Sequence, residues 1–239
     1  MDNINKLQQM IDESERIVFF GGAGVSTESG IKDFRSVDGL YNEKYDYPPE
    51  VMLSRSFFNE HQKEFYKFYK DKLNCLDVEP NVTHMYLKSL EDKGKLSAIV
   101  TQNIDGLHEK AGNKNIYLLH GTIYSNHCMM CDKEYDAEYV FNSKDIIPRC
   151  TCNGIIKPDV VLYEEGLDNN TVNGAIDAIS NADMLIIGGT SLVVYPAASF
   201  IRYFKGKYLV IINKDVTSYD SNANLVIHDS LGNIFSNLK

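Results

Sequence analysis

The sequence predicts an α/β fold, in which a doubly wound parallel sheet carries a small inserted module. Short runs of β-branched and other apolar residues alternate with longer stretches of helical spacing. The first of these runs is followed at once by glycines. Residues 122–157 interrupt the alternation and hold four of the five cysteines.

The apolar runs are predicted to be strands. They are apolar throughout rather than alternating, which is typical of strands buried on both faces of a parallel sheet. They span residues 16–20, 96–100, 116–119, 160–163, 184–187, 208–212 and 225–227. Right-handed crossovers then place the loops that follow these strands along one edge of the sheet.

Helical spacing of apolar residues predicts the intervening helices, in residues 1–15, 54–73, 81–93, 170–181 and 196–204. Gly94 and Gly112 lie where helix C-caps are expected. Residues 34–50 lack periodicity, so we expect a long loop over the sheet edge, within a flexible loop and helical segment at 34–80. The break in pattern at 122–157 predicts a small module inserted into an α/β domain of residues 1–121 and 158–239.

The composition disfavours nucleic-acid binding and indicates where the protein is located. The 239 residues carry a formal net charge of −9 with no conspicuous Lys/Arg cluster, whereas a protein that binds nucleic acid is expected to have a basic face. The acidic balance favours neutral or basic partners. We expect neither a secretory signal nor a membrane span, because the apolar runs are too short. An odd number of cysteines without an export signal predicts a cytoplasmic protein.

Two of the predicted strands end in glycine-rich turns. Gly21, Gly22 and Gly24 follow the first strand, and Gly188-Gly189 follows residues 184–187. Glycines have no side chain, so the backbone can approach a phosphate group closely. The N-terminus of the helix that follows such a turn favours the negative charge of the phosphate. Thr27 stands where the dinucleotide fingerprint of dehydrogenases has its third glycine, which disfavours hydride transfer. Two such turns could hold the halves of a dinucleotide, although each alone is also compatible with a tight structural turn.

Polar side chains follow the strand that ends at residue 100. The segment 101–108 contains Gln102, Asn103 and Asp105, at the sheet edge where α/β proteins bind ligands. An amide and a carboxylate close together could hold a carboxamide, because together they supply hydrogen-bond donors and acceptors. The alternative is helix capping by Asn103 or Asp105.

His120 ends the apolar run at 116–119 and is expected to face the same cleft. An unperturbed histidine pKa of about 6.5 suits a general base at neutral pH. A lone histidine at a strand end is more often structural. Its place beside the 101–108 segment favours the catalytic interpretation.

Four cysteines have the spacing of metal ligands. Cys128-x2-Cys131 is followed roughly 20 residues later by Cys150-x-Cys152, which is typical of a tetrahedral Zn(Cys)4 site. A redox or chance cluster is the alternative. Since sulfur fills all four positions and the module offers no acid to activate water, the zinc is expected to be structural. Cys75 is expected to be a small core or surface residue.

Together, these motifs resemble those of the sirtuin family, over nearly the whole chain. The first family signature is matched by Gly-Ala-Gly-Val-Ser at 22–26, Ser-Gly-Ile at 29–31 and Asp-Phe-Arg-Ser at 33–36. The second is matched by residues 101–108, the catalytic histidine by His120-Gly121 and the zinc ribbon by the four cysteines. The peptide groove, the second NAD loop and the adenosine side are matched by residues 156–161, 189–192 and 212–213. Each motif alone is modest, whereas their order and spacing are specific.

The resemblance implies an NAD-binding role for the α/β domain. The implied contacts to phosphate and ribose are Ala23, Thr27, Phe34 and Arg35, where Phe34 shields the reacting ribose. Those to the ribose hydroxyls and nicotinamide are Gln102, Ile104 and Asp105, with Asn103 nearby. Those to the adenosine half are Thr190, Ser191 and Asn213, with residues 230–231 at the adenine.

The resemblance also implies the activity, an NAD-dependent protein lysine deacetylase or deacylase that releases nicotinamide, O-acyl-ADP-ribose and the free lysine. The acyl oxygen would attack the ribose, and His120, with Asn103 as a second catalytic residue, would remove a proton from a ribose hydroxyl. NAD would be the co-substrate and one Zn²⁺ the structural ion. The acyl-lysine peptide would add as a strand between residues 160–163 and 192–195, with little sequence selection.

Three positions depart from the family pattern. Lys32 stands where proline is usual, which predicts a more mobile loop. Glu164 stands where the family has glycine, which leaves the geometry of the peptide groove open. Family members specific for long acidic acyl groups carry a Tyr-x-x-Arg pair, whereas here Tyr66 is followed by Tyr69. Without an arginine to pair a distal carboxylate, acetyl or another uncharged acyl group is expected rather than succinyl.

Two other functions stay open at this point. NAD hydrolysis or ADP-ribosyl transfer would use the same scaffold. A zinc ribbon can also belong to a non-catalytic nucleic-acid-binding module, which the acidic balance and the intact His120 disfavour.

Overall fold

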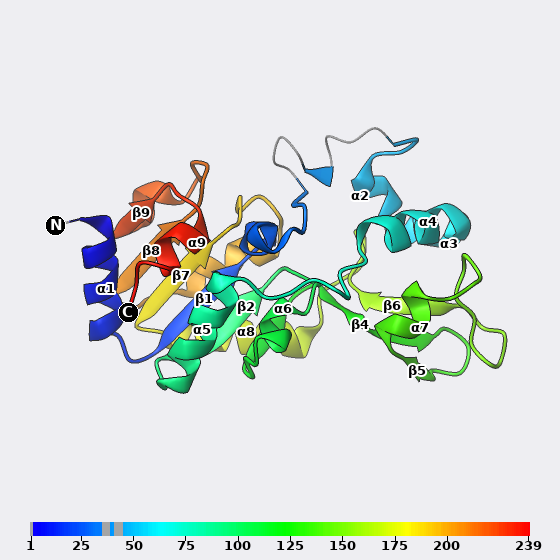
Figure 1. The fold of residues 1–239 in the computed structure, drawn as a ribbon, viewed down its shortest axis with the longest axis horizontal. Coiled ribbons are helices and arrows are strands. Elements are labelled where there is room, and N and C mark those ends of the chain that lie inside the picture. The colour runs from blue at the N-terminus through cyan, green and yellow to red at the C-terminus, as the bar shows by residue number, and fades with distance from the viewer. Residues whose placement is uncertain (1, 35–38, 41–44) are drawn as a thin grey trace.

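The computed structural model of the chain describes residues 2–34, 39–40 and 45–239. Its elements fall into two groups that lie at opposite ends of the molecule (Figure 1). The helices and strands of residues 49–72 and 121–160 form what we call the small lobe. The other described helices and strands form the α/β lobe.

The sheet of the α/β lobe is parallel throughout, in the order β3-β2-β1-β7-β8-β9. Its strands are β1 (Ile17–Gly21), β2 (Leu96–Thr101), β3 (Ile116–Leu118), β7 (Met184–Gly188), β8 (Tyr208–Ile212) and β9 (Leu225–Ile227). The chain order reverses between β1 and β7, and ligands bind outside the carboxyl ends of the strands at such a point. The predicted doubly wound sheet is confirmed.

Helices cover both faces of this sheet. Along β1, Ile17 and Phe19 belong to one core, and Val18 and Phe20 belong to the other. The first face packs against α1 (Asn3–Glu13), α5 (Val82–Asp92) and α9 (Leu231–Phe235), and the second against α8 (Asn169–Asn181) and the 3₁₀ helix η4 (Ala197–Tyr203). Burial on both faces explains why these strands are apolar throughout.

Short elements follow the carboxyl ends of the central strands. They are η1 (Ala23–Val25) and η2 (Thr27–Ser29) after β1, α6 (Leu107–Lys110) after β2, and η5 (Asp220–Asn222) after β8. Gly94 and Gly112 have φ of +71° and +94°, as expected for C-caps. In the part of the chain that the structure describes, no helix is long and apolar enough to cross a membrane.

The small lobe is an antiparallel sheet covered by helices. β4 (Gly121–Cys128) pairs with β5 (Glu134–Tyr135) on one side and with β6 (Ile156–Val160) on the other. The helices are α2 (Pro49–Met52), α3 (Arg55–Glu60), α4 (Gln62–Lys72) and α7 (Ala137–Phe141). They share one apolar core with the sheet, in which the rings of Tyr69 and Phe141 stack at 5.3 Å. The helices of residues 49–72 therefore pack on the cysteine-containing module.

The helix predicted over residues 54–73 is wrong in one respect, since the structure has two helices there, α3 and α4. The backbone of His61 leaves the helical conformation, with φ −129° and ψ 48°. With this break, Phe58 of α3 and Phe65 of α4 pack edge to face in one core. The helix predicted at 196–204 is the 3₁₀ helix η4.

The strand predicted at residues 160–163 does not belong to the parallel sheet. β6 ends at Val160 and pairs with β4 at an edge of the small sheet, where Pro158 is tolerated. Tyr163 instead forms an isolated parallel bridge with Ser54. The segment after β6 therefore bonds to the start of α3 instead of adding a strand to the parallel sheet.

Candidate active site

A cavity of about 1110 Å³ lies at the carboxyl ends of β1, β2, β7 and β8, and residues 160–165 add a wall. Most small-molecule sites have about 300–1,000 Å³, so this one has room for a large ligand. It is lined by Ala23, Thr27, Phe34, Gln102, Asn103, Ile104, Asp105, His120, Thr190, Ser191 and Asn213. The structure thus brings together every predicted ligand-binding residue that it describes. Arg35 lies outside the described residues.

The two glycine turns touch each other through their backbones. The Gly24 N–H donates to the Gly189 carbonyl at 2.9 Å, and the Gly22 N–H donates to the Gly188 carbonyl at 3.2 Å. A Cβ on Gly24 would lie 2.8 Å from the Gly189 Cα, and Gly189 has φ +59°. Side chains are excluded from this contact, so backbone forms the cavity wall where β1 and β7 end. Such a cradle fits the pyrophosphate of a dinucleotide.

Buried hydrogen bonds join the segment after β2 to the first glycine turn. The Ser26 hydroxyl donates to Asp105 Oδ2 at 2.6 Å, and the Asn103 amide donates to Ser26 Oγ at 3.1 Å. The Leu107 N–H donates to Asp105 Oδ1 at 3.0 Å and starts α6. Burial raises the pKa of Asp105, and these bonds oppose that shift. The N-cap position of α6 is Gly106, so Asp105 is not the cap itself, but its carboxylate both lines the cavity and accepts the first N–H of the helix.

His120 is oriented by the backbone that follows β2. Its Nδ1 lies 2.9 Å from the Gln102 carbonyl oxygen. Because a carbonyl oxygen only accepts, Nδ1 carries the proton, and Nε2 is the basic nitrogen of a neutral imidazole. Burial lowers the pKa of His120, and the bond to Gln102 opposes that shift. The Gln102 side chain donates to Thr190 Oγ1 at 3.1 Å, which links it to the second glycine turn.

The four predicted metal ligands converge in the small lobe. Their sulfur atoms all lie within 4.8 Å of one another, and those of Cys128 and Cys152 are 3.5 Å apart, as are those of Cys131 and Cys150. Tetrahedral zinc with Zn–S bonds of about 2.3 Å requires sulfurs about 3.8 Å apart. Four thiols at this spacing fit one Zn²⁺. Among the described residues that line the cavity, none is one of these cysteines.

Ser26 and Glu164 contribute to the site in ways that their motifs do not predict. Ser26 belongs to the first motif, but its bond to Asp105 joins residues 79 positions apart, a separation at which no local pattern signals a contact. Glu164 does have a signal, because it stands where the family pattern has glycine. Its φ is +76°, a backbone conformation that favours glycine.

A parallel sheet of this strand order, with glycine turns where the order reverses, defines a dinucleotide-binding α/β protein. The family model described as the Sir2 family matches residues 22–196, which is more than half of the chain. The chain belongs to the Sir2 family.

Relatives match over almost the full length of the chain. The NAD-dependent protein deacetylase of Clostridium acetobutylicum is 58% identical over 237 residues, which cover 98% of this chain and 97% of that protein. The NAD-dependent protein deacetylase of Clostridium perfringens is 59% identical with the same coverage. A Sir2 structure with deacetylated p53 peptide and 3'-O-acetyl ADP-ribose superposes with a TM-score of 0.90 at 36% identity, covering 98% and 96% of the two chains. One with p53 peptide and NAD⁺ has a TM-score of 0.86 at 35% identity, covering 99% and 96%.

Proposed function

We propose that this chain is an NAD-dependent protein lysine deacetylase, which releases nicotinamide, O-acyl-ADP-ribose and the deacylated lysine. The observation that carries the proposal is the geometry of His120, a neutral imidazole at the cavity wall with Nδ1 bonded to the Gln102 carbonyl. The Clostridium relatives named above are NAD-dependent protein deacetylases, which supports the same activity here.

His120 is the proposed general base. With Nδ1 engaged by Gln102, Nε2 is the nitrogen that accepts a proton, and its target is a hydroxyl of the NAD-derived ribose after nicotinamide has left. Burial keeps the imidazole neutral and therefore able to act as a base. Asn103 is the second proposed catalytic residue, and its amide is held by Ser26. NAD supplies, when bound, the ADP-ribosyl group that takes up the acyl group.

Each part of NAD, from the nicotinamide to the adenosine, has its own proposed contacts. Asp105 and Ile104 hold the nicotinamide, which is supported by the bonds that fix the Asp105 carboxylate. The ribose and phosphate contacts are Gln102, Ala23, Thr27, Phe34 and Arg35. The adenosine contacts are Thr190, Ser191 and Asn213, all of which line the cavity where β7 and β8 end.

Zn²⁺ is proposed to be structural, held by Cys128, Cys131, Cys150 and Cys152. The Tyr135 hydroxyl donates to Cys150 Sγ at 3.0 Å, which supports a charged thiolate there. Along the chain, we assign residues 122–157 to the zinc module and residues 1–121 and 158–239 to the NAD-binding domain. In space, the helices α2 to α4 of the segment 34–80 pack on the zinc module and complete the small lobe. Thiolate ligands persist in a reducing compartment, which supports the proposed cytoplasmic location.

The acyl-lysine peptide is proposed to add as a strand between residues 160–163 and 192–195. Both segments contribute to the cavity wall. Large apolar side chains are exposed there, with Tyr163 39%, Val193 55% and Tyr195 68% exposed, as is typical of a binding surface. Tyr66 and Tyr69 are fully buried in the small-lobe core and are not among the residues that line the cavity. Their burial supports the preference for uncharged acyl groups.

Incubation of the protein with NAD and an acetyl-lysine peptide tests the proposed function. We expect nicotinamide release that depends on the peptide, with one nicotinamide formed for each lysine freed. Nicotinamide release without peptide would instead identify an NAD hydrolase. Transfer of ADP-ribose to protein, seen as a mass increase, would identify an ADP-ribosyltransferase.

Matched peptides with acetyl and succinyl groups test the acyl preference. We expect kcat/KM to be at least about tenfold higher for the acetyl peptide, because a carboxylate that loses water without gaining a cationic partner is destabilised. Faster turnover of the succinyl peptide would contradict this preference but not the deacylase activity.

A further inference from the structure

Glu164 has a left-handed backbone at the wall of the cavity. Its φ is +76°, a region that glycine occupies freely and that is unfavourable for residues with a Cβ. Such conformations persist only where the surroundings hold them, and they are concentrated at functional sites. Glu164 lies directly after residues 160–163, against which the peptide is proposed to pair, and it lines the cavity with them.

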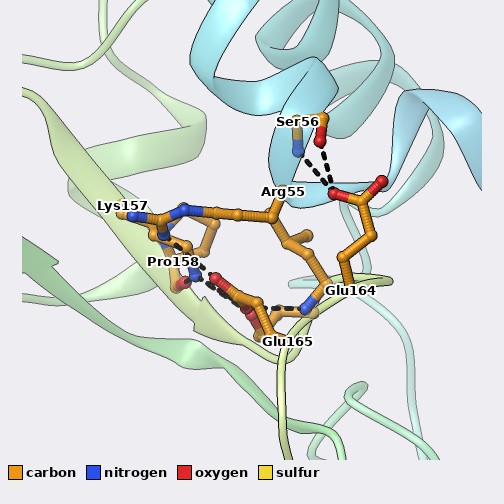
Figure 2. Close-up of polar contacts among 8 residues, drawn as sticks. Arg55, Ser56, Lys157, Pro158, Glu164 and Glu165 are labelled. Atoms are coloured by element: carbon orange, nitrogen blue, oxygen red, sulfur yellow. Dashed lines mark hydrogen bonds and ion pairs between the residues drawn. The ribbon is translucent and has the colours of Figure 1, made fainter.

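The side chain of Glu164 holds this conformation through one partner. Its Oε2 accepts the Ser56 backbone N–H at 2.8 Å and the Ser56 hydroxyl at 2.7 Å (Figure 2). Ser56 is the second residue of α3, where backbone N–H groups have no acceptor within the helix. These two bonds lower the pKa of Glu164, so the carboxylate is charged at neutral pH.

The neighbours of Glu164 are bonded to the same lobe. The Arg55 N–H donates to the Tyr163 carbonyl at 3.0 Å. Glu165 pairs with Arg55 Nη1 at 3.0 Å through one oxygen and with Lys157 Nζ at 3.3 Å through the other (Figure 2). Residues 163–165 are thus fixed to α3 and β6 at three consecutive positions. Of the three, Glu164 is the one with a left-handed backbone, and among the described residues its side chain bonds only to Ser56. Glu165, by contrast, also accepts the Leu162 N–H at 2.8 Å.

We propose that Glu164 is a positioning residue for the acyl-lysine peptide. This inference rests on the proposed function, because it concerns the segment on which that peptide adds. The bond to Ser56 keeps the backbone in the conformation that the peptide meets, so that binding does not have to reorder it. When the binding-competent conformation is populated only part of the time, the apparent affinity falls by that fraction. Two residues can keep the left-handed backbone populated at position 164: glutamate, through its bond to Ser56, and glycine, which occupies this region without any bond.

A direct electrostatic role for Glu164 makes a different prediction. An exposed carboxylate at a groove can attract basic peptide residues. The geometry favours the positioning role, because two donors of Ser56 already share Oε2. Loss of a charge affects Glu164→Ala and Glu164→Gly equally. Loss of a backbone constraint affects the alanine variant far more than the glycine variant.

Steady-state kinetics with saturating NAD and an acetyl-lysine peptide distinguish these roles. For Glu164→Ala we expect the peptide KM to rise about tenfold, as for a conformation populated about one-tenth of the time, with kcat and the KM for NAD within about twofold. For Glu164→Gly we expect a peptide KM within about threefold of the wild-type value, since glycine occupies the left-handed region readily. Ser56→Ala keeps the N–H donor and should fall between the two. Glu60→Ala, at the exposed far end of α3, is the matched control and should change nothing.

Thermal unfolding adds a readout that does not depend on activity. Glu164→Gly should melt at a higher temperature than Glu164→Ala, because only alanine keeps the strained backbone. Equal KM increases in both variants, or an unchanged KM in Glu164→Ala, would overturn the inference. If wild-type protein shows no peptide-dependent turnover, the proposed function fails and this inference with it. Active wild-type protein with an unaffected alanine variant contradicts this inference alone.

Discussion

The α/β lobe and the small lobe are ordered by different interactions. In the α/β lobe all residues of β1 and β7 are buried, and helices cover both faces of the sheet. The small lobe has a sheet of three strands and a core rich in aromatic rings. Its four convergent cysteines lie at the edge of this core, with Cys128 and Cys150 buried and Cys131 and Cys152 exposed. The small lobe has an extensive apolar core of its own, so we expect a bound metal to add to the stability from packing, at the end of the lobe where Cys131 and Cys152 reach the surface.

The two walls of the cavity differ in the charged side chains that hold them. On the α/β side, the glycine turns and His120 are fixed by backbone hydrogen bonds at the ends of parallel strands. On the other side, residues 160–165 also have backbone hydrogen bonds, such as that from the Arg55 N–H to the Tyr163 carbonyl, and the charged side chains of Glu164 and Glu165 add bonds to α3 and β6. The proposed chemistry is therefore positioned by the lobe that burial stabilises. The proposed peptide wall is held to the small lobe by hydrogen bonds and ion pairs with α3 and β6.

The substitution His120→Ala removes the chemistry while leaving both lobes intact. We expect deacylation to fall by about 10²–10⁴-fold, the usual contribution of a general base. The melting temperature and a zinc content of one per chain should be retained, because His120 lines the cavity and belongs neither to an apolar core nor to the cysteine cluster. Product formation with an acetyl-lysine peptide, measured beside circular dichroism and zinc analysis, checks this. Near-normal turnover in the variant would sink the assignment of His120.

The substitution Cys131→Ser breaks the small lobe alone. A loss of about 3 kcal/mol from a weakened zinc site lowers the melting temperature by about 6–12 °C for a chain of this size. Zinc content should fall below one per chain, and the peptide KM should rise because β6 leads directly into residues 160–165. The control is Cys75→Ala, which removes a cysteine that is not part of the cluster and should keep its zinc. Full activity without zinc would show that packing alone orders the small lobe.

The same contrast explains how much can be predicted from the sequence. Strands such as β1 and β8 are apolar throughout because they are buried on both faces, so their pattern is local and visible. The cysteines and the glycine turns are likewise local motifs. The packing of α4 on α7 joins Tyr69 to Phe141, and no local pattern signals a contact between positions so far apart.

Within the site, the motifs predict which residues take part, but not which groups they are hydrogen-bonded to. His120 and Asp105 stand out by residue type and place. Their orientation comes from the Gln102 carbonyl and the Ser26 hydroxyl, and the first of these is a backbone group that residue types do not reveal. Glu164 is the converse case, because its departure from glycine is visible in the sequence whereas its bond to Ser56 is a tertiary contact.

Two buried histidines of the α/β lobe are expected to lower the free energy of unfolding in acid. His84 of α5 and His108 of α6 are buried, with ring centroids 4.8 Å apart. Burial lowers the pKa of His84 to about 4 and that of His108 well below its usual value. In the unfolded chain both bind protons near pH 6.5. The stability is therefore complete above that pH and is lost as the pH falls towards 4, by up to about 1.4 kcal/mol per pH unit for each histidine.

The substitution His84→Gln separates this effect from acid release of zinc. Glutamine at this position can still accept the Asn81 N–H that His84 Nδ1 now accepts at 3.2 Å, so the helix cap is kept. Both proteins lose zinc in acid, so that contribution cancels in the difference between them. Between pH 6.5 and 4, the free energy of unfolding from urea titrations should fall less steeply in the variant, by about 1.4 kcal/mol per pH unit. Parallel pH profiles would mean that His84 is already charged in the folded protein, in which case burial of the α/β core does not exclude its proton.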